Sequence, residues 1–180
     1  TGLWQFMYPT GKHLGLKINS YVDERCDPYK STVAAAEYLK YLYGIFKDWR
    51  MVLAAYNAGP GTISRAIRRS GGKKTYWEIR PFLPQETQGY VPAFIAANYI
   101  MNFAQYHGMS PAVPRKNFLQ IDTVFIKQQM SFDQISQVLD VPVEEIEYFN
   151  PQYRKFIIPS GNNPLCLSKE KIAHFITEKI

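Results

Sequence analysis

Cysteine and histidine are scarce in this sequence, with two and three residues among 180. Cys26 and Cys166 lie far apart and match neither a zinc motif nor a disulfide framework, so they do not indicate a cellular compartment. His13, His107 and His174 fit no motif for metal binding or catalysis. The sequence therefore predicts no metal site and implies no cofactor.

Long apolar runs are also missing. No stretch of 18 apolar residues occurs, so we expect no transmembrane helix. The chain has no signal peptide and no initiator methionine, and its first residues, Thr1-Gly2-Leu3-Trp4, already belong to a motif. We therefore expect further sequence upstream of Thr1.

Acidic residues are few in the first part of the chain. Residues 1–116 hold 15 Lys and Arg against 7 Asp and Glu, a charge of +8, whereas residues 117–180 hold 6 against 8, a charge of −2. A basic surface suits an anionic polymer, either a nucleic acid or peptidoglycan with its peptide carboxylates. A solvated helix face is the simpler interpretation of the densest basic cluster, which comprises Arg65, Arg68, Arg69, Lys73 and Lys74.

The composition favours a folded chain of one or two domains, because 46% of the 180 residues are hydrophobic. Residues 110–116 contain Ser-Pro-Ala-Val-Pro, which is typical of a stiff linker, and the charge changes sign at the same place. Helices are expected before this linker. A strand–helix–helix–strand order is expected after it, followed by a terminal helix.

Two of the expected helices are long. The first runs from Ser31 or Thr32 to about Phe46, with an apolar stripe of Val33, Ala36, Leu39, Tyr43 and Phe46. The second, Val91–His107, carries Pro92 in its first turn and is apolar on nearly every side. We predict that this second helix is the buried centre of its domain.

The stretch Leu53-Ala54-Ala55-Tyr56-Asn57-Ala58-Gly59-Pro60-Gly61 ends another predicted helix, which Asp48 caps at its start. Glycine and proline stop the helix, which leaves two polar side chains, those of Tyr56 and Asn57, at a well-fixed end. A tight helix corner with a buried tyrosine is the alternative interpretation of this stretch.

Two further motifs accompany this stretch. Gly2-Leu3-Trp4-Gln5 opens the chain, and Glu86-Thr87-Gln88-Gly89-Tyr90-Val91 follows later. The three motifs in this order resemble those of the lysozyme-like lytic transglycosylases with an SLT domain. With Trp before Gln and the second domain included, the chain looks most like the membrane-bound lytic murein transglycosylase D type.

The second domain resembles a LysM repeat through Asp140–Ile146 and Phe149-Asn150-Pro151. The Gly-Asp-Thr-Leu turn usual after the first strand is here Gln128-Gln129-Met130-Ser131, a departure that bears on sugar binding. The resemblance thus implies a mainly α, lysozyme-like domain over residues 1–109 that lacks its N-terminal part. A linker would follow over 110–116, then a LysM-like βααβ domain with an extra C-terminal helix over 117–180.

The resemblance also implies an activity, the cleavage of MurNAc–GlcNAc bonds in peptidoglycan to 1,6-anhydro-MurNAc products. One Glu acts first as the acid and then as the base, and a hydrophobic pocket must raise its pKa. In the family this Glu precedes Gly-Leu-x-Gln, which here means upstream of Thr1. We therefore expect the catalytic acid to be missing and this chain to be inactive alone.

Other carboxylates are weak substitutes for that acid. Glu24 lies in a loop, Glu37 lies on a helix exterior, and Glu78 matches no motif. Glu86 is the best remaining candidate, although the family uses its counterpart for substrate contacts and local structure.

The remaining site residues follow from the resemblance one at a time. Tyr56 matches the tyrosine whose hydroxyl orients the catalytic Glu, and a buried structural tyrosine is the alternative. Gln5 matches a glutamine whose amide binds an N-acetyl group or the catalytic carboxylate, and it could instead cap the first turn. Core packing is the alternative for Trp4 and Tyr90, and helix capping for Asn57. The predicted substrate-binding residues are Trp4, Gln5, Asn57, Glu86 and Tyr90.

The predicted partner is the peptidoglycan glycan strand, which implies the periplasm of a bacterial cell envelope. We expect a monomer, with peripheral or lipid-anchored membrane association only through upstream sequence. A non-catalytic peptidoglycan-binding protein is the main alternative, and a goose-type lysozyme that hydrolyses with water is another. No recognition motif accompanies the basic charge, so a nucleic-acid partner is not predicted.

Overall fold

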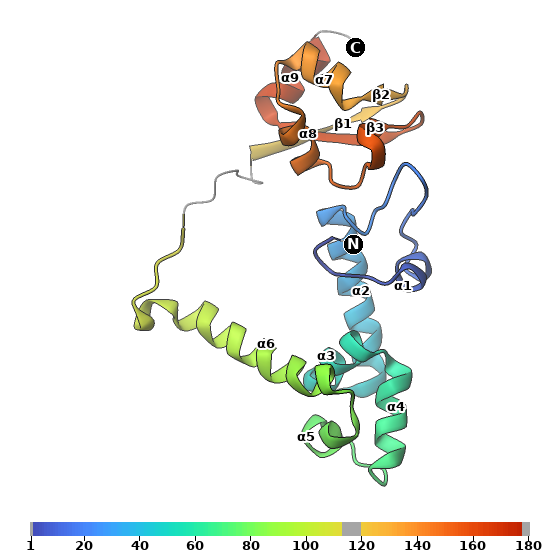
Figure 1. Ribbon diagram of the computed structural model, residues 1–180, viewed down its shortest axis with the longest axis vertical. Coiled ribbons are helices and arrows are strands. Elements are labelled where there is room, and N and C mark those ends of the chain that lie inside the picture. The colour runs from blue at the N-terminus through green and yellow to red at the C-terminus, as the bar shows by residue number, and fades with distance from the viewer. Residues whose placement is uncertain (1, 113–119, 178–180) are drawn as a thin grey trace. The chain divides into compact units, whose positions relative to one another are not determined.

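The computed structural model describes residues 2–112 and 120–177, and these are mainly helical (Figure 1). By packing, the chain forms two compact units, one of Thr1–Ala35 with Pro114–Ile180 and the other of Ala36–Val113. Helix α2 (Pro28–Phe46) supplies residues to both units. The predicted fold class, a mainly α domain followed by a small α+β domain, is confirmed. The predicted domain boundaries remain a prediction, and residues 113–116 of the predicted linker lie outside the described residues.

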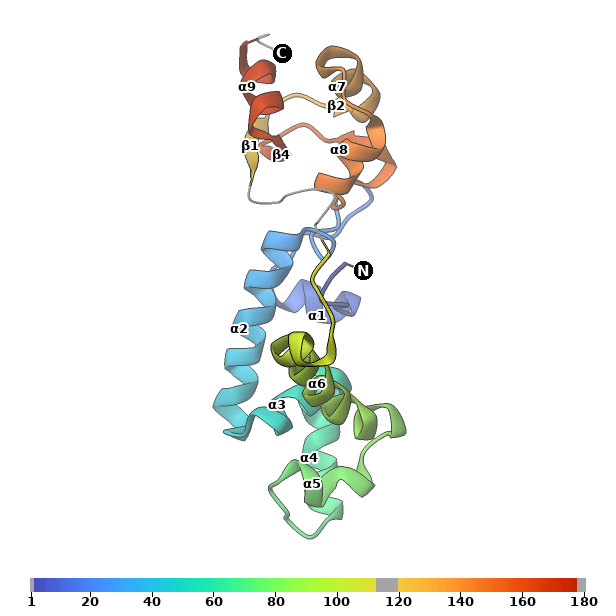
Figure 2. The same ribbon diagram turned by 90° about the vertical axis from the view of Figure 1, so that its left-hand side faces the viewer.

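The unit of residues 36–113 is built around α3 (Trp49–Ala58), which contacts α4 (Pro60–Arg69), α5 (Tyr76–Ile79) and α6 (Gln85–Phe103) (Figure 2). Two short 3₁₀ turns complete it, η1 (Arg80–Phe82) and η2 (Ala104–His107). Asp48 caps α3 as predicted, since its carboxylate accepts from the amides of Arg50 and Met51. Small residues let the helices approach closely in a core of Leu42, Met51, Val52, Ala54, Ala55, Ile63, Ala66, Tyr76, Ile79, Leu83 and Val91.

Gly59 makes the corner between α3 and α4. Its φ of 84° and ψ of 145° fall in a region that side chains disfavour, and its amide donates to the carbonyl of Ala55 at 2.8 Å. Pro60 then starts α4 at once, where its missing N–H is not needed. The predicted helix stop is therefore confirmed, and the next helix starts immediately after it, at Pro60.

Helix α2 only partly follows the predicted stripe, of which Leu39 and Phe46 pack against the core. Ala34, Ala35 and Leu42 are buried, whereas Val33 and Tyr43 are exposed. Apolar residues occur on both faces of this helix, so periodicity alone did not identify the buried one.

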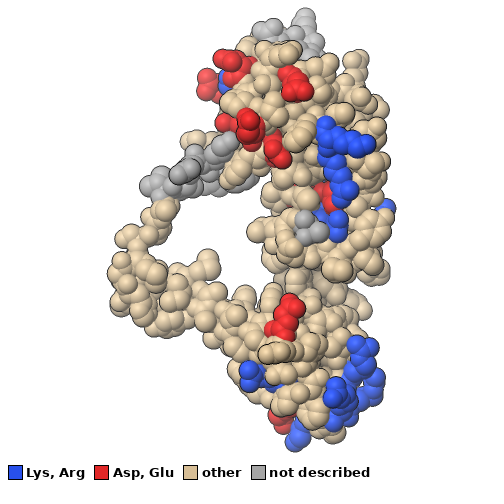
Figure 3. Space-filling model, in the orientation of Figure 1, with Lys and Arg blue, Asp and Glu red and all other residues tan. Residues whose placement is uncertain are grey.

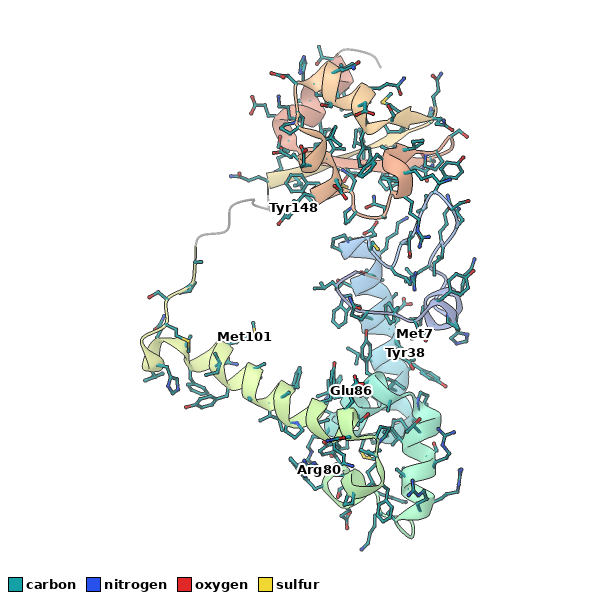
Figure 4. All side chains as sticks on the ribbon, in the orientation of Figure 1. Met7, Tyr38, Arg80, Glu86, Met101 and Tyr148 are labelled. Carbon is teal, nitrogen blue, oxygen red and sulfur yellow. The ribbon has the colours of Figure 1, made fainter. Side chains whose placement is uncertain are left out.

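Helix α6 begins at Gln85, earlier than predicted, and this puts Pro92 inside the helix rather than in its first turn. The prediction of a buried central helix is wrong. Among the described residues of α6, Thr87 and Val91 are buried, whereas Met101, labelled in Figure 4, is 83% exposed. The helix packs on α3 and η1, and its later turns are exposed.

The C-terminal part of the chain has the predicted βααβ order with one addition. Strand β1 (Ile121–Ile126) pairs antiparallel with β4 (Asn163–Ser168), and the addition is a two-residue pair of β2 (Met130–Ser131) and β3 (Ile157–Ile158). Helices α7 (Phe132–Leu139) and α8 (Val143–Phe149) and the turn η4 (Arg154–Phe156) lie between them. Ser131 caps α7 with a capping box to Gln134.

The predicted terminal helix is α9 (Lys169–Thr177), which packs on β1, β4 and α7. In this helix Ile172 and Phe175 are buried, whereas Ile176 is exposed. At the other end of the chain, α1 (Tyr8–His13) follows the Gly2–Gln5 turn.

Candidate functional site

The end of α3 and the start of α6 meet through Asn57. Its Nδ2 donates to Glu86 Oε1 at 3.1 Å, and its Oδ1 accepts from Thr87 Oγ1 at 2.8 Å. Thr87 is 1% exposed. Glu86, labelled in Figure 4, is exposed. Two of the three motifs are therefore joined by side-chain hydrogen bonds, with a carboxylate at the surface of the junction.

A second set of contacts holds the backbone of this junction. Pro92 has no N–H for the carbonyl of Gln88, four residues earlier. Tyr76 Oη and Arg80 Nε each donate to that carbonyl at 2.9 Å, and Tyr76 Oη also lies 3.2 Å from the carbonyl of Thr87. Sequence reasoning missed Tyr76 and Arg80. The spacing of Pro92 from Gln88 could have shown that a carbonyl needed an outside donor.

Tyr56 stands beside this junction and is partly buried. Burial raises the pKa of Tyr56 to about 12, and the nearby Tyr90 and Tyr38 phenols add to the rise. Its ring centroid lies 5.8 Å from that of Tyr38, which stacks on Tyr41 at 6.2 Å. The Tyr56 hydroxyl thus keeps its proton near neutral pH and can donate it in a hydrogen bond. The sequence analysis did not single out Tyr38.

Trp4 and Gln5 belong to the other compact unit. Trp4 Nε1 donates to Thr32 Oγ1 at 2.8 Å, and Gln5 Nε2 donates to the carbonyl of Gly2 at 2.5 Å. The amide of Gln5 therefore closes the turn that it ends. Its contact with a ligand, and that of Trp4, remain predictions.

The carboxylates weighed as substitute acids are paired or open to solvent. Glu24 pairs with Lys30 and accepts from the amide of Lys17. A hydrogen bond from the Thr75 hydroxyl lowers the pKa of Glu78, and Lys73 lies 3.5 Å from the same side chain. Glu37 and Glu86 are exposed. None of these four side chains has the apolar pocket that a neutral catalytic acid requires.

The basic cluster of Arg65, Arg68, Arg69, Lys73 and Lys74 is exposed, and Figure 3 shows Lys and Arg gathered over α4. The Arg69 guanidinium lies 5.7 Å from the centroid of the Phe82 ring. Within residues 2–112 and 120–177, no group of three His, Cys, Asp or Glu side chains is arranged to hold a metal ion.

Comparisons with known proteins match both parts of the chain. The profile of the Transglycosylase SLT domain matches residues 1–79, and that of the Lytic transglycosylase MltD, LysM-like domain, matches residues 120–179. Proteins named membrane-bound lytic murein transglycosylase D from Escherichia coli K12 and from Escherichia coli O6:H1 are each 31% identical over 184 residues. These alignments cover 99% of this chain and 40% of each relative, so the chain spans well under half of their length.

In the described part of the chain, no helix combines the length and the apolar character needed to span a membrane. The two profiles follow the same order along the chain as the motifs and the folded parts. The chain belongs to the lytic murein transglycosylase family and joins an SLT domain to an MltD-type LysM-like domain.

Proposed function

We propose that the chain is the part of a peptidoglycan lytic transglycosylase that binds the glycan strand around the end of α3. The observation that carries the proposal is the hydrogen-bonded junction of Asn57, Glu86 and Thr87 beside the protonated hydroxyl of Tyr56. Asn57 and Glu86 supply amide and carboxylate groups that can hydrogen-bond sugar hydroxyls and N-acetyl groups. Tyr90, Trp4 and Gln5 are the further proposed substrate contacts.

The chemistry of the complete protein needs one acid–base Glu. It gives its proton to the leaving glycosidic oxygen, and the bond from the anomeric carbon to that oxygen breaks. The 6-hydroxyl of the same MurNAc then bonds to the anomeric carbon and returns its proton to the Glu. The Tyr56 hydroxyl would orient that Glu by donating a hydrogen bond to it.

We propose that residues 1–180 bind glycan without cleaving it. This proposal is supported by the surroundings of Glu24, Glu37, Glu78 and Glu86, none of which is an apolar pocket. The substrate places the protein at the bacterial cell envelope, in the periplasm. We further propose that the chain is a monomer.

The test uses insoluble peptidoglycan and the whole chain. The chain should co-sediment with peptidoglycan and release no 1,6-anhydro fragments detectable by mass spectrometry. Asn57→Ala should weaken binding about tenfold, because it removes two hydrogen bonds of the junction. Asn102→Ala on the exposed part of α6 is the matched control and should bind normally.

A different experimental result would contradict each part of the proposal. Release of anhydro fragments would show that the acid lies within these residues, and reducing ends would indicate hydrolysis of the lysozyme type instead. Failure to co-sediment, or equal binding by the two asparagine variants, would contradict the binding site.

A further inference from the structure

The segment after α1 takes part in the core of the LysM-like domain. Val22 is 2% exposed and lies in the same buried cluster as Tyr153. An antiparallel bridge pairs these two residues, and the amide of Asp23 donates to the carbonyl of Gln152 at 2.8 Å. Residues near the start of the chain thus contribute to the core of the LysM-like domain.

The Asp23 carboxylate forms ion pairs with an arginine of its own segment and with one of the LysM-like domain. Arg25 donates to it through Nε at 2.9 Å and Nη2 at 2.7 Å, and Arg154 Nη2 lies 2.5 Å from its Oδ2. Asp23 is 3% exposed. A buried carboxylate must be paired. Loss of Arg154 would leave the ion pair of Asp23 with Arg25 but would remove one charged hydrogen bond from Asp23 Oδ2.

Arg25 also contacts the segment that contains the Gly-Leu-Trp-Gln motif. Its Nη1 donates to the carbonyl of Phe6 at 3.1 Å. A Cβ built on Gly2 would lie 2.0 Å from the carbonyl oxygen of Arg25, so the two backbones touch. Arg25 therefore contacts the first residue of the motif and the residue that follows its last one.

The motif needs such support because its backbone is strained. Gln5 has a φ of +52°, in the left-handed region that residues with a Cβ disfavour. Such a conformation costs about 1 kcal/mol or more and persists only where the surroundings fix it. The hydrogen bond from Gln5 to Gly2 closes the turn, and the backbone of Arg25 lies against Gly2.

We infer that Arg154 of the LysM-like domain is a positioning residue for the Gly2–Gln5 motif, acting through Asp23 and Arg25. The LysM-like domain then supports the Gly2–Gln5 motif structurally, separately from any sugar binding of its own. The inference rests on the proposed function only for the part that the motif plays toward the glycan.

Hydrogen–deuterium exchange of the whole chain tests this linkage. Arg154→Ala should speed exchange of the amides of residues 2–7 about tenfold, because it removes a charged hydrogen bond from a buried carboxylate. Exchange in β1 and β4 should change less than about twofold. Arg154→Lys keeps the charge and should restore part of the protection, while Arg68→Ala, on the exposed face of α4, should change nothing at residues 2–7.

Two results would overturn the inference. One is unchanged exchange at residues 2–7 in Arg154→Ala, and the other is equal acceleration there and in β1 and β4, which indicates general destabilisation. Binding of glycan strands is measured on the same samples. If the unaltered chain binds no glycan, the proposed function fails, and the exchange of residues 2–7 still decides the structural linkage.

Discussion

At the scale of residues, the carbonyl of Gln88 shows how the site depends on a group outside the motifs. Pro92 withdraws the helical donor, and Tyr76 and Arg80 replace it. Both replacements hold the first turn of α6, where Glu86 and Thr87 meet Asn57. The buried phenol of Tyr76 therefore helps to hold the turn that carries the polar junction.

Removal of that phenol hydroxyl has a predictable cost. Tyr76→Phe should lower the free energy of unfolding by about 1–2 kcal/mol, because the Gln88 carbonyl loses one of its two donors. Urea denaturation measures the change. Tyr106→Phe, at an 85% exposed tyrosine, should stay within about 0.5 kcal/mol of the unaltered chain. Equal losses in the two variants would contradict this role of Tyr76.

Asp23 is expected to make the folding stability of the chain depend on pH. Hydrogen bonds from Arg25, then from Arg154, lower the pKa of Asp23 from 3.8 to about 2 despite its burial. Because the folded pKa is the lower one, the stabilisation is complete above the unfolded value of 3.8 and is lost as pH falls through about 2.

The unfolding free energy should therefore fall by about 2 kcal/mol from this group alone between about pH 5 and pH 2. Asp23→Asn should remove that part of the pH dependence in urea titrations. Glu147→Gln, at an exposed carboxylate of α8, is the control and should keep the full dependence. Parallel pH profiles for both variants would show that Asp23 gains no stability from its arginines.

At the scale of elements, the corner between α3 and α4 depends on one backbone conformation. Gly59→Ala should destabilise the chain by about 2 kcal/mol, since a Cβ is strained at φ 84° even though no atom lies near it. Gly44→Ala, inside α2 with open space around it, should instead gain about 0.5–1 kcal/mol. Thermal unfolding distinguishes the two substitutions, and a shift of the same sign in both would contradict the account of the corner.

The elements also show what local pattern can predict. The cap at Asp48 and the stop at Gly59 follow from residues a few positions apart, and the structure has both. The burial of α6 was wrongly predicted, because an apolar composition does not say which surface covers a helix. Tyr76 and Arg80 were missed for a different reason, since the position of Pro92 indicates a carbonyl that needs a donor but does not indicate which side chains reach it.

At the scale of the whole molecule, sequence motifs and packing divide the chain differently. The profiles match residues 1–79 and 120–179, whereas packing groups Thr1–Ala35 with Pro114–Ile180. Asp23, Arg25 and Arg154 account for part of that difference, because they tie residues 131 positions apart. No local sequence pattern predicts the contact of Asp23 with Arg154, because Arg154 follows the LysM-like motif and Asp23 precedes the first long helix.

We propose that the glycan strand binds at the junction of α3 and α6. The most direct measurement is hydrogen–deuterium exchange of the whole chain with and without a MurNAc–GlcNAc tetrasaccharide. We predict slower exchange at residues 56–58 and 86–90 on binding. Protection confined to residues 120–177, or to the basic cluster over α4, would contradict the claim and place the glycan elsewhere.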